Sequence, residues 1–215
     1  MSKHSFDRLS AAFIALIAWS GLILQYVLLV EATRNNLGVV LATLRFFSFF
    51  TILSNLLVAL IVTFAATGTR FARETVLARL RGAAALCIGI TCAIYFFVLA
   101  SLWTPQGAQL LADVTMHYIV PVFYLLWWLL GAPHRQLRWS DAPRWLLVPL
   151  AYLIWILLRG AWLHEYPYPF VDVDTLGAAV VARNCVGVAL LFLLFGLVLV
   201  GLDRRLGSAD PDRAP

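Results

Sequence analysis

The stretch RFFSFFTILSN, from Arg45 to Asn55, decides how this chain is interpreted, because it places polar side chains inside a long apolar segment. On a helix, residues three, four and seven apart share one face. Arg45, Ser48 and Asn55 then lie on one stripe, with Thr51 nearly in line. A guanidinium, hydroxyls and an amide on one face need polar partners. We therefore expect other helices to supply them.

The composition around this stretch is that of a membrane protein. Of the 215 residues, 62% are hydrophobic, against roughly 45–50% in ordinary soluble domains. The mean hydropathy is +0.88. The net charge of +5 comes from arginines in short connecting segments rather than from one basic face. Nucleic acid is therefore not expected as a partner.

Six apolar segments are long enough to cross a membrane as helices. They cover residues 9–30, 46–67, 83–103, 114–131, 145–163 and 176–202. The strict alternation of a membrane barrel is absent. The first segment has no clear cleavage site and is interpreted as a retained helix rather than a signal peptide. We predict an all-α, polytopic six-transmembrane-helix bundle over residues 1–206, with a disordered tail over 207–215.

Basic residues in the connections predict the orientation, because cytoplasmic loops carry an excess of lysine and arginine. One set of connections holds Lys3, Arg8, Arg70, Arg73, Arg79, Arg81, Arg135, Arg138, Arg144, Arg204, Arg205 and Arg213. The opposite set holds Arg34, with Arg45 at a helix end, together with Glu31, Asp113, Glu165, Asp172 and Asp174. Both termini are therefore predicted to be cytoplasmic.

Several polar residues inside the predicted spans fall at a similar depth below the outer surface. A helical rise of about 1.5 Å per residue places them in one layer. The set that could line one cavity is Arg45, Ser48, Thr51, His117, Arg159, Arg183 and Asn184. Polar side chains at membrane depth indicate a functional site, because each is costly there unless it is paired or hydrated. The alternatives are hydroxyls bonded to their own helix and arginines that reach the headgroups.

The chemistry that these residue types permit is nucleophilic attack on a lipid ester. A hydroxyl becomes a nucleophile when a base takes its proton, and His117 could take it from Ser48 or from Thr51. Asp113, one turn earlier, could orient the imidazole. The substrate-binding candidates are Arg45, Asn55, Arg159, Arg183 and Asn184, of which Asn55 or an arginine could stabilise an oxyanion and another arginine could hold a fatty carboxylate.

Other classes of function are compatible with some of the same residues. The same arginines could serve a binder or small transporter of an anionic lipid or carboxylate that catalyses nothing. A metal site built from His117, Asp113, His164 and Glu165 is disfavoured, because no tight ligand spacing supports it. Haem is disfavoured because His117 has no second histidine within a span. We therefore predict no cofactor and no metal.

Three segments resemble one family of membrane proteins. They are RFFSF at residues 45–49, MHYIVPVFY at 116–124 and WLHEYPYPF at 162–170. In order, spacing and topology they resemble the androgen-induced-gene family of six-helix integral membrane proteins, in particular its bacterial branch. The resemblance extends from the second predicted helix to the sixth.

Animal members of that family are threonine hydrolases that cleave fatty acid esters of hydroxy fatty acids. The resemblance implies that His117 is the catalytic histidine and that the YPYPF loop covers the cavity. It places Ser48 where the family has its threonine, whereas Thr51 is one turn further on, so both stay candidates for the nucleophile. It also implies membrane lipids or fatty acyl esters as partners and the bacterial inner membrane as the location.

Overall fold

The computed structural model describes residues 3–69 and 73–207, and over these residues it contains helices and no strand. Within this described part of the chain, six helical spans are long and apolar enough to cross a membrane. They are Asp7–Thr33, Phe50–Thr67, Glu74–Leu102, Gly107–Leu130, Asp141–Leu163 and Ala178–Leu206. This confirms the prediction of an all-helical chain with six spanning segments. The predicted tail, from residue 208 on, and the basic residues Arg70 and Arg213 lie outside the described residues.

The first half of the chain forms three spans and a short extra helix. These are α1 (Lys3–Thr33), α2 (Gly38–Phe46), α3 (Phe50–Thr67) and α4 (Glu74–Ile94). The third span continues beyond α4 through a π-helix, η1 (Tyr95–Leu99), and a 3₁₀ turn, η2 (Ala100–Leu102).

The second half forms the remaining three spans. The fourth span is made of α5 (Gly107–Val114), the π-helix η3 (Thr115–Ile119) and α6 (Val120–Leu130). The fifth is made of α7 (Asp141–Trp145) and α8 (Leu147–Leu163). A loop with η4 (Pro169–Val171) and α9 (Val173–Leu176) leads to the last span, α10 (Ala178–Leu206).

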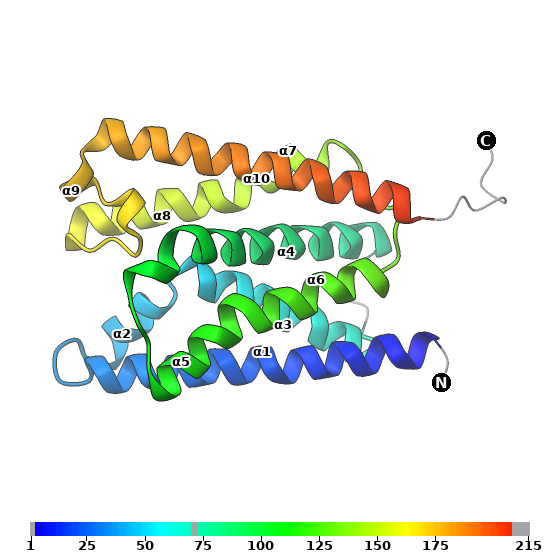
Figure 1. The fold of residues 1–215 in the computed structure, drawn as a ribbon, viewed down its shortest axis with the longest axis horizontal. Coiled ribbons are helices and arrows are strands. Elements are labelled where there is room, and N and C mark those ends of the chain that lie inside the picture. The colour runs from blue at the N-terminus through cyan, green and yellow to red at the C-terminus, as the bar shows by residue number, and fades with distance from the viewer. Residues whose placement is uncertain (1–2, 70–72, 208–215) are drawn as a thin grey trace.

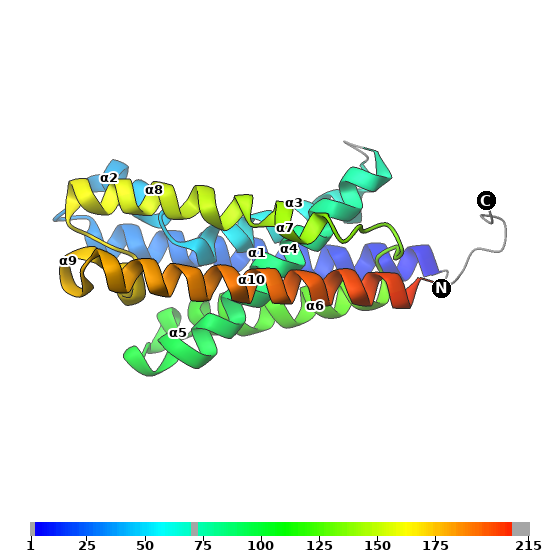
Figure 2. The same ribbon diagram turned by 90° about the horizontal axis from the view of Figure 1, so that it is seen from above.

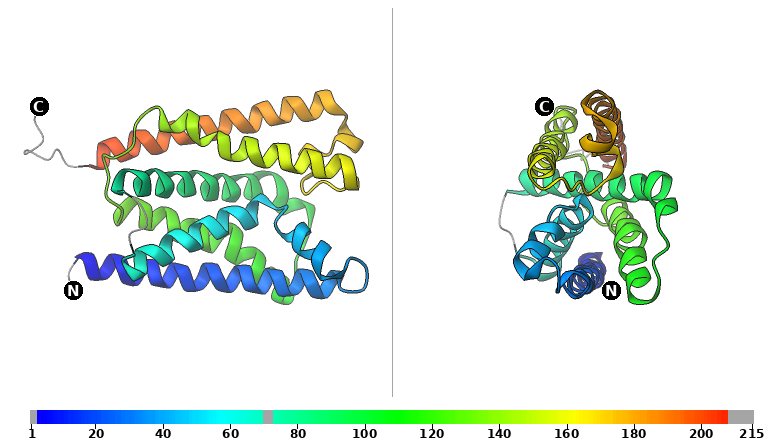
Figure 3. Two further views of the ribbon diagram at one scale, coloured as in Figure 1. Left: turned by 180° about the vertical axis from the view of Figure 1, so that it is seen from behind. Right: turned by 90° about the vertical axis from the view of Figure 1, so that its left-hand side faces the viewer.

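Helix α4 lies at the centre of the bundle. It contacts α3 and α6 on one side and α10 on the other, and Figure 1 shows it between the α8/α10 pair and the α1/α3/α6 group. Small residues allow this close packing, as is common between membrane helices. A Cβ atom on Gly82 would approach the ring of Trp145 to 2.8 Å. The end view in Figure 3 shows the same two groups on either side of α4, and the view from above in Figure 2 shows α8 and α10 next to each other.

The start of α1 and the end of α10 lie at the same end of the bundle (Figure 1). The other end carries α2, the short turn η2, the start of α5, and the loop of η4 and α9. Figure 1 places these connections together on the side away from the two termini. The candidate residues of the sequence lie toward this second end.

The structure differs from the prediction in the stretch from Arg45 to Asn55. Residues 46–67 were predicted to form one helix, but α2 ends at Phe46 and α3 begins at Phe50. Phe49 between them is extended, with φ −92° and ψ 126°. Because the chain turns here, neighbouring aromatic rings reach different partners. Phe46 packs on Tyr26, whereas Phe50 packs on Tyr152. The prediction that Arg45, Ser48, Thr51 and Asn55 form a stripe on one helix is therefore wrong.

Candidate functional site

The interruption between α2 and α3 puts Thr51 in the first turn of α3. The N-cap of this helix is Phe49, so Thr51 is its second residue, and the side chain is buried with 8% of its surface exposed. The first backbone N–H groups of a helix have no partner within it. The Thr51 N–H instead donates to the Tyr168 hydroxyl at 3.3 Å. The nucleophile candidate thus lies at the positive end of a helix dipole.

His117 lies in the middle of the π-helix η3. Its π geometry is visible in the bond from the Val120 N–H to the Thr115 carbonyl, five residues back. Pro121, four residues after His117, has no N–H to offer the His117 carbonyl, which weakens the regular helix at this point. Single π-turns inside helices occur frequently at functional sites.

The structure brings Thr51 and His117 together. Thr51 Oγ1 lies 3.3 Å from His117 Nε2, although the two residues are 66 positions apart. The other ring nitrogen, Nδ1, lies 3.0 Å from the Asp113 carbonyl oxygen. Because a carbonyl only accepts, Nδ1 carries the proton and Nε2 is left to accept one from Thr51. This is the tautomer that a general base requires.

Asp113 and Tyr95 surround the far side of the imidazole. Asp113 Oδ1 lies 3.2 Å from His117 Nδ1, although its alignment is poor for a hydrogen bond. Asp113 Oδ2 accepts a 2.5 Å bond from the Tyr95 hydroxyl, which in turn accepts from the Trp103 indole at 3.1 Å. The Tyr95 ring stacks on the His117 ring at 3.7 Å between centroids. The imidazole is therefore fixed by contacts on its edge and on its face.

Tyr95 is the first residue of the second π-helix, η1. The His117 and Tyr95 rings thus come from two π-turns in neighbouring spans. Sequence reasoning missed Tyr95 and Trp103, because a tyrosine and a tryptophan near a helix end are read as interfacial anchors. The one feature of the sequence that could have identified them is that they are expected at the same depth in the membrane as Asp113.

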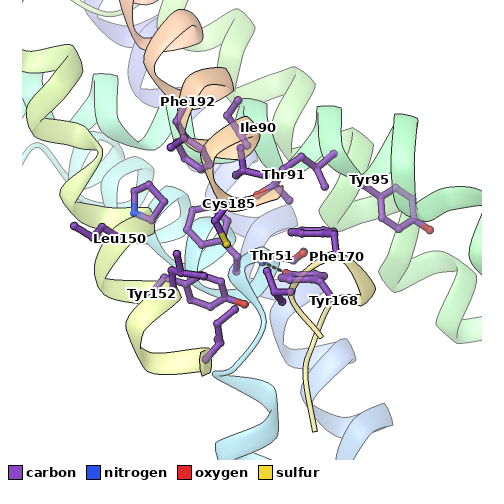
Figure 4. Close-up of a pocket in the computed structure, with 18 of the residues that line it drawn as sticks. Thr51, Ile90, Thr91, Tyr95, Leu150, Tyr152, Tyr168, Phe170, Cys185 and Phe192 are labelled. Atoms are coloured by element: carbon purple, nitrogen blue, oxygen red, sulfur yellow. Dashed lines mark hydrogen bonds between the residues drawn. The ribbon is translucent and has the colours of Figure 1, made fainter. Parts of the chain in front are cut away.

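Thr51 lines an apolar cavity of about 280 Å³. This volume is just below the usual range for ligand pockets, roughly 300–1,000 Å³. The described residues that form its wall carry no charge; they are Phe50, Thr51, Ile90, Thr91, Ile94, Tyr95, Leu99, Leu146, Pro149, Leu150, Tyr152, Leu153, Ile156, Tyr168, Phe170, Val171, Cys185, Val188, Ala189 and Phe192. Figure 4 shows Thr51 and Tyr168 side by side on one wall. Such a cavity suits a hydrocarbon chain.

Ser48 has other partners than His117. It is buried with 1% of its surface exposed, and its Oγ donates to the Leu44 carbonyl at 2.7 Å, the common bond of a helical serine. Its own carbonyl accepts the Tyr152 hydroxyl at 2.8 Å. Among the described residues, Ser48 has no hydrogen bond to His117 and is not part of the cavity wall. Its position favours a structural role in the turn between α2 and α3.

Asn55 connects α3 to η3. Its Nδ2 donates to the Thr51 carbonyl at 2.8 Å and to the Met116 carbonyl at 3.1 Å. Both contacts hold the backbone next to the two reactive side chains. Within the described part of the chain, the Asn55 Oδ1 atom is buried and has no partner. Asn55 therefore positions the site, and its amide protons are already used.

Two of the candidate arginines share one carboxylate. Arg45 Nε lies 2.8 Å from Glu165 Oε1, and Arg159 Nη2 lies 2.6 Å from Glu165 Oε2. Arg159 also donates to the Glu165 carbonyl at 3.0 Å. Arg159 is thus buried but paired, and these contacts tie the loop after α8 to α2. Sequence reasoning did not pair Glu165 with the arginines, because the two arginines are 114 positions apart in the chain.

The last two candidates lie apart from the nucleophile. Arg183 is exposed on α10. Asn184 Nδ2 donates to the Phe170 carbonyl at 3.0 Å, so it fixes the loop that covers the cavity. Neither residue is part of the cavity wall as the described residues form it.

The four residues weighed as a metal site do not converge. His117 contacts Asp113, whereas His164 pairs with Asp174 at 2.9 Å and Glu165 pairs with the arginines. Among the described residues, no group of three or more histidine, cysteine, aspartate or glutamate side chains could hold a metal ion.

Comparisons with family models, with curated proteins and with solved structures found no match for this chain. The resemblance of the three segments to the androgen-induced-gene family stays a prediction. The geometry of the site must therefore carry any functional proposal.

Proposed function

We propose that this chain is an intramembrane hydrolase of acyl esters, with Thr51 as the nucleophile and His117 as the base. One observation carries the proposal: the 3.3 Å contact between Thr51 Oγ1 and His117 Nε2 at the wall of an apolar cavity. A hydroxyl and an imidazole within hydrogen-bond reach, with the imidazole oriented by a third group, form the usual arrangement for covalent catalysis.

In the first step Thr51 Oγ attacks the carbonyl carbon of the ester, and its proton passes to His117 Nε2. The carbonyl π electrons move to the oxygen and form an oxyanion. The C–O bond to the alcohol then breaks, and the leaving alcohol takes the proton from His117 Nε2. Water, activated by the same nitrogen, hydrolyses the acyl-threonine ester and releases a fatty acid. Asp113 stabilises the imidazolium formed in each half of the cycle.

The cavity supports a substrate with a hydrocarbon chain. No charged side chain lies among the described residues that line it, so the part of the ligand that enters should be uncharged. Membrane lipids or fatty acyl esters fit this requirement and reach the site from the bilayer. The arginines are bound to Glu165, so they are not free to hold a substrate carboxylate.

We infer that the protein is integral to a membrane, with the site toward the outer face and both termini in the cytoplasm. Support comes from the distribution of charge. The connections and helix ends beside the termini carry Arg8, Arg73, Arg79, Arg81, Arg135, Arg138, Arg144, Arg204 and Arg205. The connections at the end with the site carry Arg34 and Arg45, with Arg159 and Arg183 inside the neighbouring spans. The family resemblance adds the bacterial inner membrane as the proposed location.

Labelling with a fluorophosphonate probe tests the mechanism. The full-length protein in detergent should react, and Thr51→Ala should abolish labelling because no other hydroxyl contacts His117 among the described residues. Ser48→Ala is the matched control: it removes a buried hydroxyl one turn away and should leave labelling close to that of the wild type. Labelling that depends on Ser48 and survives Thr51→Ala would transfer the nucleophile to Ser48.

The second candidate is a protein that binds or transports an anionic lipid without cleaving it. In this function a ligand carboxylate would replace Glu165 as the partner of Arg45 and Arg159, which now hold the two oxygens of that side chain. Retention of a fatty acid that is lost in Arg45→Gln and Arg159→Gln variants, together with no probe labelling of the wild type, would establish this function instead.

A further inference from the structure

The proposed reaction needs a hydrogen-bond donor for the oxyanion, because donors aimed at the developing charge are among the largest contributions to catalysis. The donors expected from the sequence are already engaged. The Asn55 amide donates to two carbonyl oxygens. Arg45 and Arg159 are paired with Glu165. The donor must therefore come from another residue at the cavity.

Most of the other hydroxyls at the cavity also have acceptors for their protons. Tyr152 donates to the Ser48 carbonyl at 2.8 Å. Thr91 donates to the Cys87 carbonyl at 2.9 Å, and Tyr95 donates to Asp113 at 2.5 Å. Using any of these protons for a substrate would break a bond that the fold makes.

Tyr168 differs from them. Its hydroxyl oxygen accepts the Thr51 N–H at 3.3 Å, and the hydroxyl groups of Thr51 and Tyr152 lie beside it. The Tyr168 proton therefore faces hydroxyl oxygens at the reacting end of the cavity, and it can turn to a substrate oxygen without breaking a bond to a backbone carbonyl or a carboxylate. The hydroxyl lies at the N-terminus of α3, where the helix dipole favours negative charge. Burial raises the pKa of Tyr168, so the phenol keeps its proton throughout the ordinary pH range.

The ring of Tyr168 is held in place. It stacks on Phe170 at 5.4 Å with an interplanar angle of 4°, and its edge meets Phe49 at 6.2 Å. The loop that carries it is fixed at Glu165 and at the bond from Asn184 to the Phe170 carbonyl. Figure 4 shows the hydroxyl of Tyr168 next to Thr51. A donor that is positioned before the reaction costs no reorganisation when the charge develops.

We propose that Tyr168 is a catalytic residue whose O–H donates a hydrogen bond to the carbonyl oxygen of the ester as Thr51 attacks it. The phenol keeps its proton throughout: the carbonyl π electrons move to the oxygen, Tyr168 stabilises the resulting oxyanion, and the oxyanion collapses as the alcohol leaves. This inference rests on the proposed hydrolase function and adds the group that stabilises its tetrahedral intermediates.

Turnover of p-nitrophenyl octanoate by the full-length protein in detergent tests this role. Tyr168→Phe keeps the ring and its stacking and removes only the hydroxyl. We expect kcat to fall about 100-fold, as when one oxyanion donor is removed, with KM little changed. Tyr166→Phe is the matched control, because it removes a phenol of the same loop that does not line the cavity, and it should leave both constants unchanged.

A rise in KM with kcat unchanged in Tyr168→Phe would overturn the inference, since the hydroxyl would then serve substrate packing only. If the variant does not fold, a structure of the wild type with an octyl trifluoromethyl ketone decides. The Tyr168 oxygen should lie within about 3.1 Å of the adduct oxygen, and a separation beyond hydrogen-bond reach overturns the proposal.

Failure of this inference is distinguishable from failure of the proposed function. Turnover that Thr51→Ala abolishes and Tyr168→Phe preserves leaves the hydrolase standing without this donor. Turnover that survives Thr51→Ala, or its absence from the wild type, removes both.

Discussion

Among the residues that the structure describes, the bundle contains two buried histidine–aspartate pairs, one toward each end. At the site, His117 lies beside Asp113. At the opposite end, His134 Nδ1 lies 3.4 Å from Asp203 Oδ1. Both aspartates are almost fully buried, with 4% and 2% of their surfaces exposed. By residue type and burial alone the two pairs are alike.

They differ in what the second ring nitrogen contacts. His117 Nε2 faces the Thr51 hydroxyl at the cavity wall, whereas His134 Nε2 faces the Leu129 carbonyl at 3.0 Å. Asp203 also accepts the Leu137 N–H at 2.9 Å, so this pair holds the loop after α6 against α10. A buried histidine–aspartate pair therefore indicates catalysis only where the ring keeps one nitrogen for a nucleophile beside a cavity.

Replacing each histidine by alanine gives the largest expected contrast. His117→Ala should lower ester turnover about 10³-fold, as loss of a general base does. His134→Ala should keep turnover and lower the free energy of unfolding by about 1–3 kcal/mol, because buried acceptors lose their donor. Turnover and thermal unfolding in detergent measure both effects. Equal losses of activity in the two variants would contradict the distinction.

Replacing the two aspartates should show the same contrast between activity and stability, with smaller effects. Asp113→Asn should lower kcat about 10- to 100-fold, equivalent to roughly 1.4–2.7 kcal/mol, because the imidazolium loses its counter-charge while the Asp113 carbonyl still holds Nδ1. Asp203→Asn should preserve kcat and lower the unfolding temperature, since the bond from the Leu137 N–H loses its charged acceptor. If kcat is unchanged in Asp113→Asn, the carbonyl alone orients the ring.

The smallest contrast compares one buried tyrosine hydroxyl near each end. Tyr95→Phe keeps the ring on His117 and removes the bond to Asp113, which should lower kcat by up to about tenfold. Tyr124→Phe removes the 3.1 Å bond to the Arg81 carbonyl. It should cost about 1 kcal/mol of stability and leave kcat unchanged. Loss of activity in Tyr124→Phe would show that the hydroxyl at Asp113 has no special role.

The six spanning helices were predictable, because runs of apolar residues long enough to cross a bilayer are unambiguous. The break between Phe46 and Phe50 was not. It contains neither proline nor glycine, the residues that usually announce the end of a helix. It arises from tertiary packing, since Phe46, Phe49 and Phe50 each pack on a ring far away in the chain.

This break explains which site residues the sequence could identify. His117 and Thr51 were both candidates, but helical spacing could not choose between Thr51 and Ser48, because the chain is not helical between them. Arg183 was expected within the layer of polar residues and is exposed, since depth alone does not say which way a side chain faces. Tyr168 was seen only as part of a covering loop. Its contact with the Thr51 N–H joins residues 117 positions apart.

The two π-turns at the site have a consequence for how this protein can change over generations. A π-turn holds one residue more than the regular helix around it, and one residue corresponds to about 100° of rotation in an α-helix. Deleting a single residue from Thr115–Ile119 would therefore return this segment to a regular helical turn, so α5 and α6 would keep their places while the side chains within the turn rotated about the axis. Such a deletion would move His117 relative to Asp113 without disturbing the core. Point substitutions can refine this end of the bundle, whereas a change in length within these five residues would take the imidazole out of position.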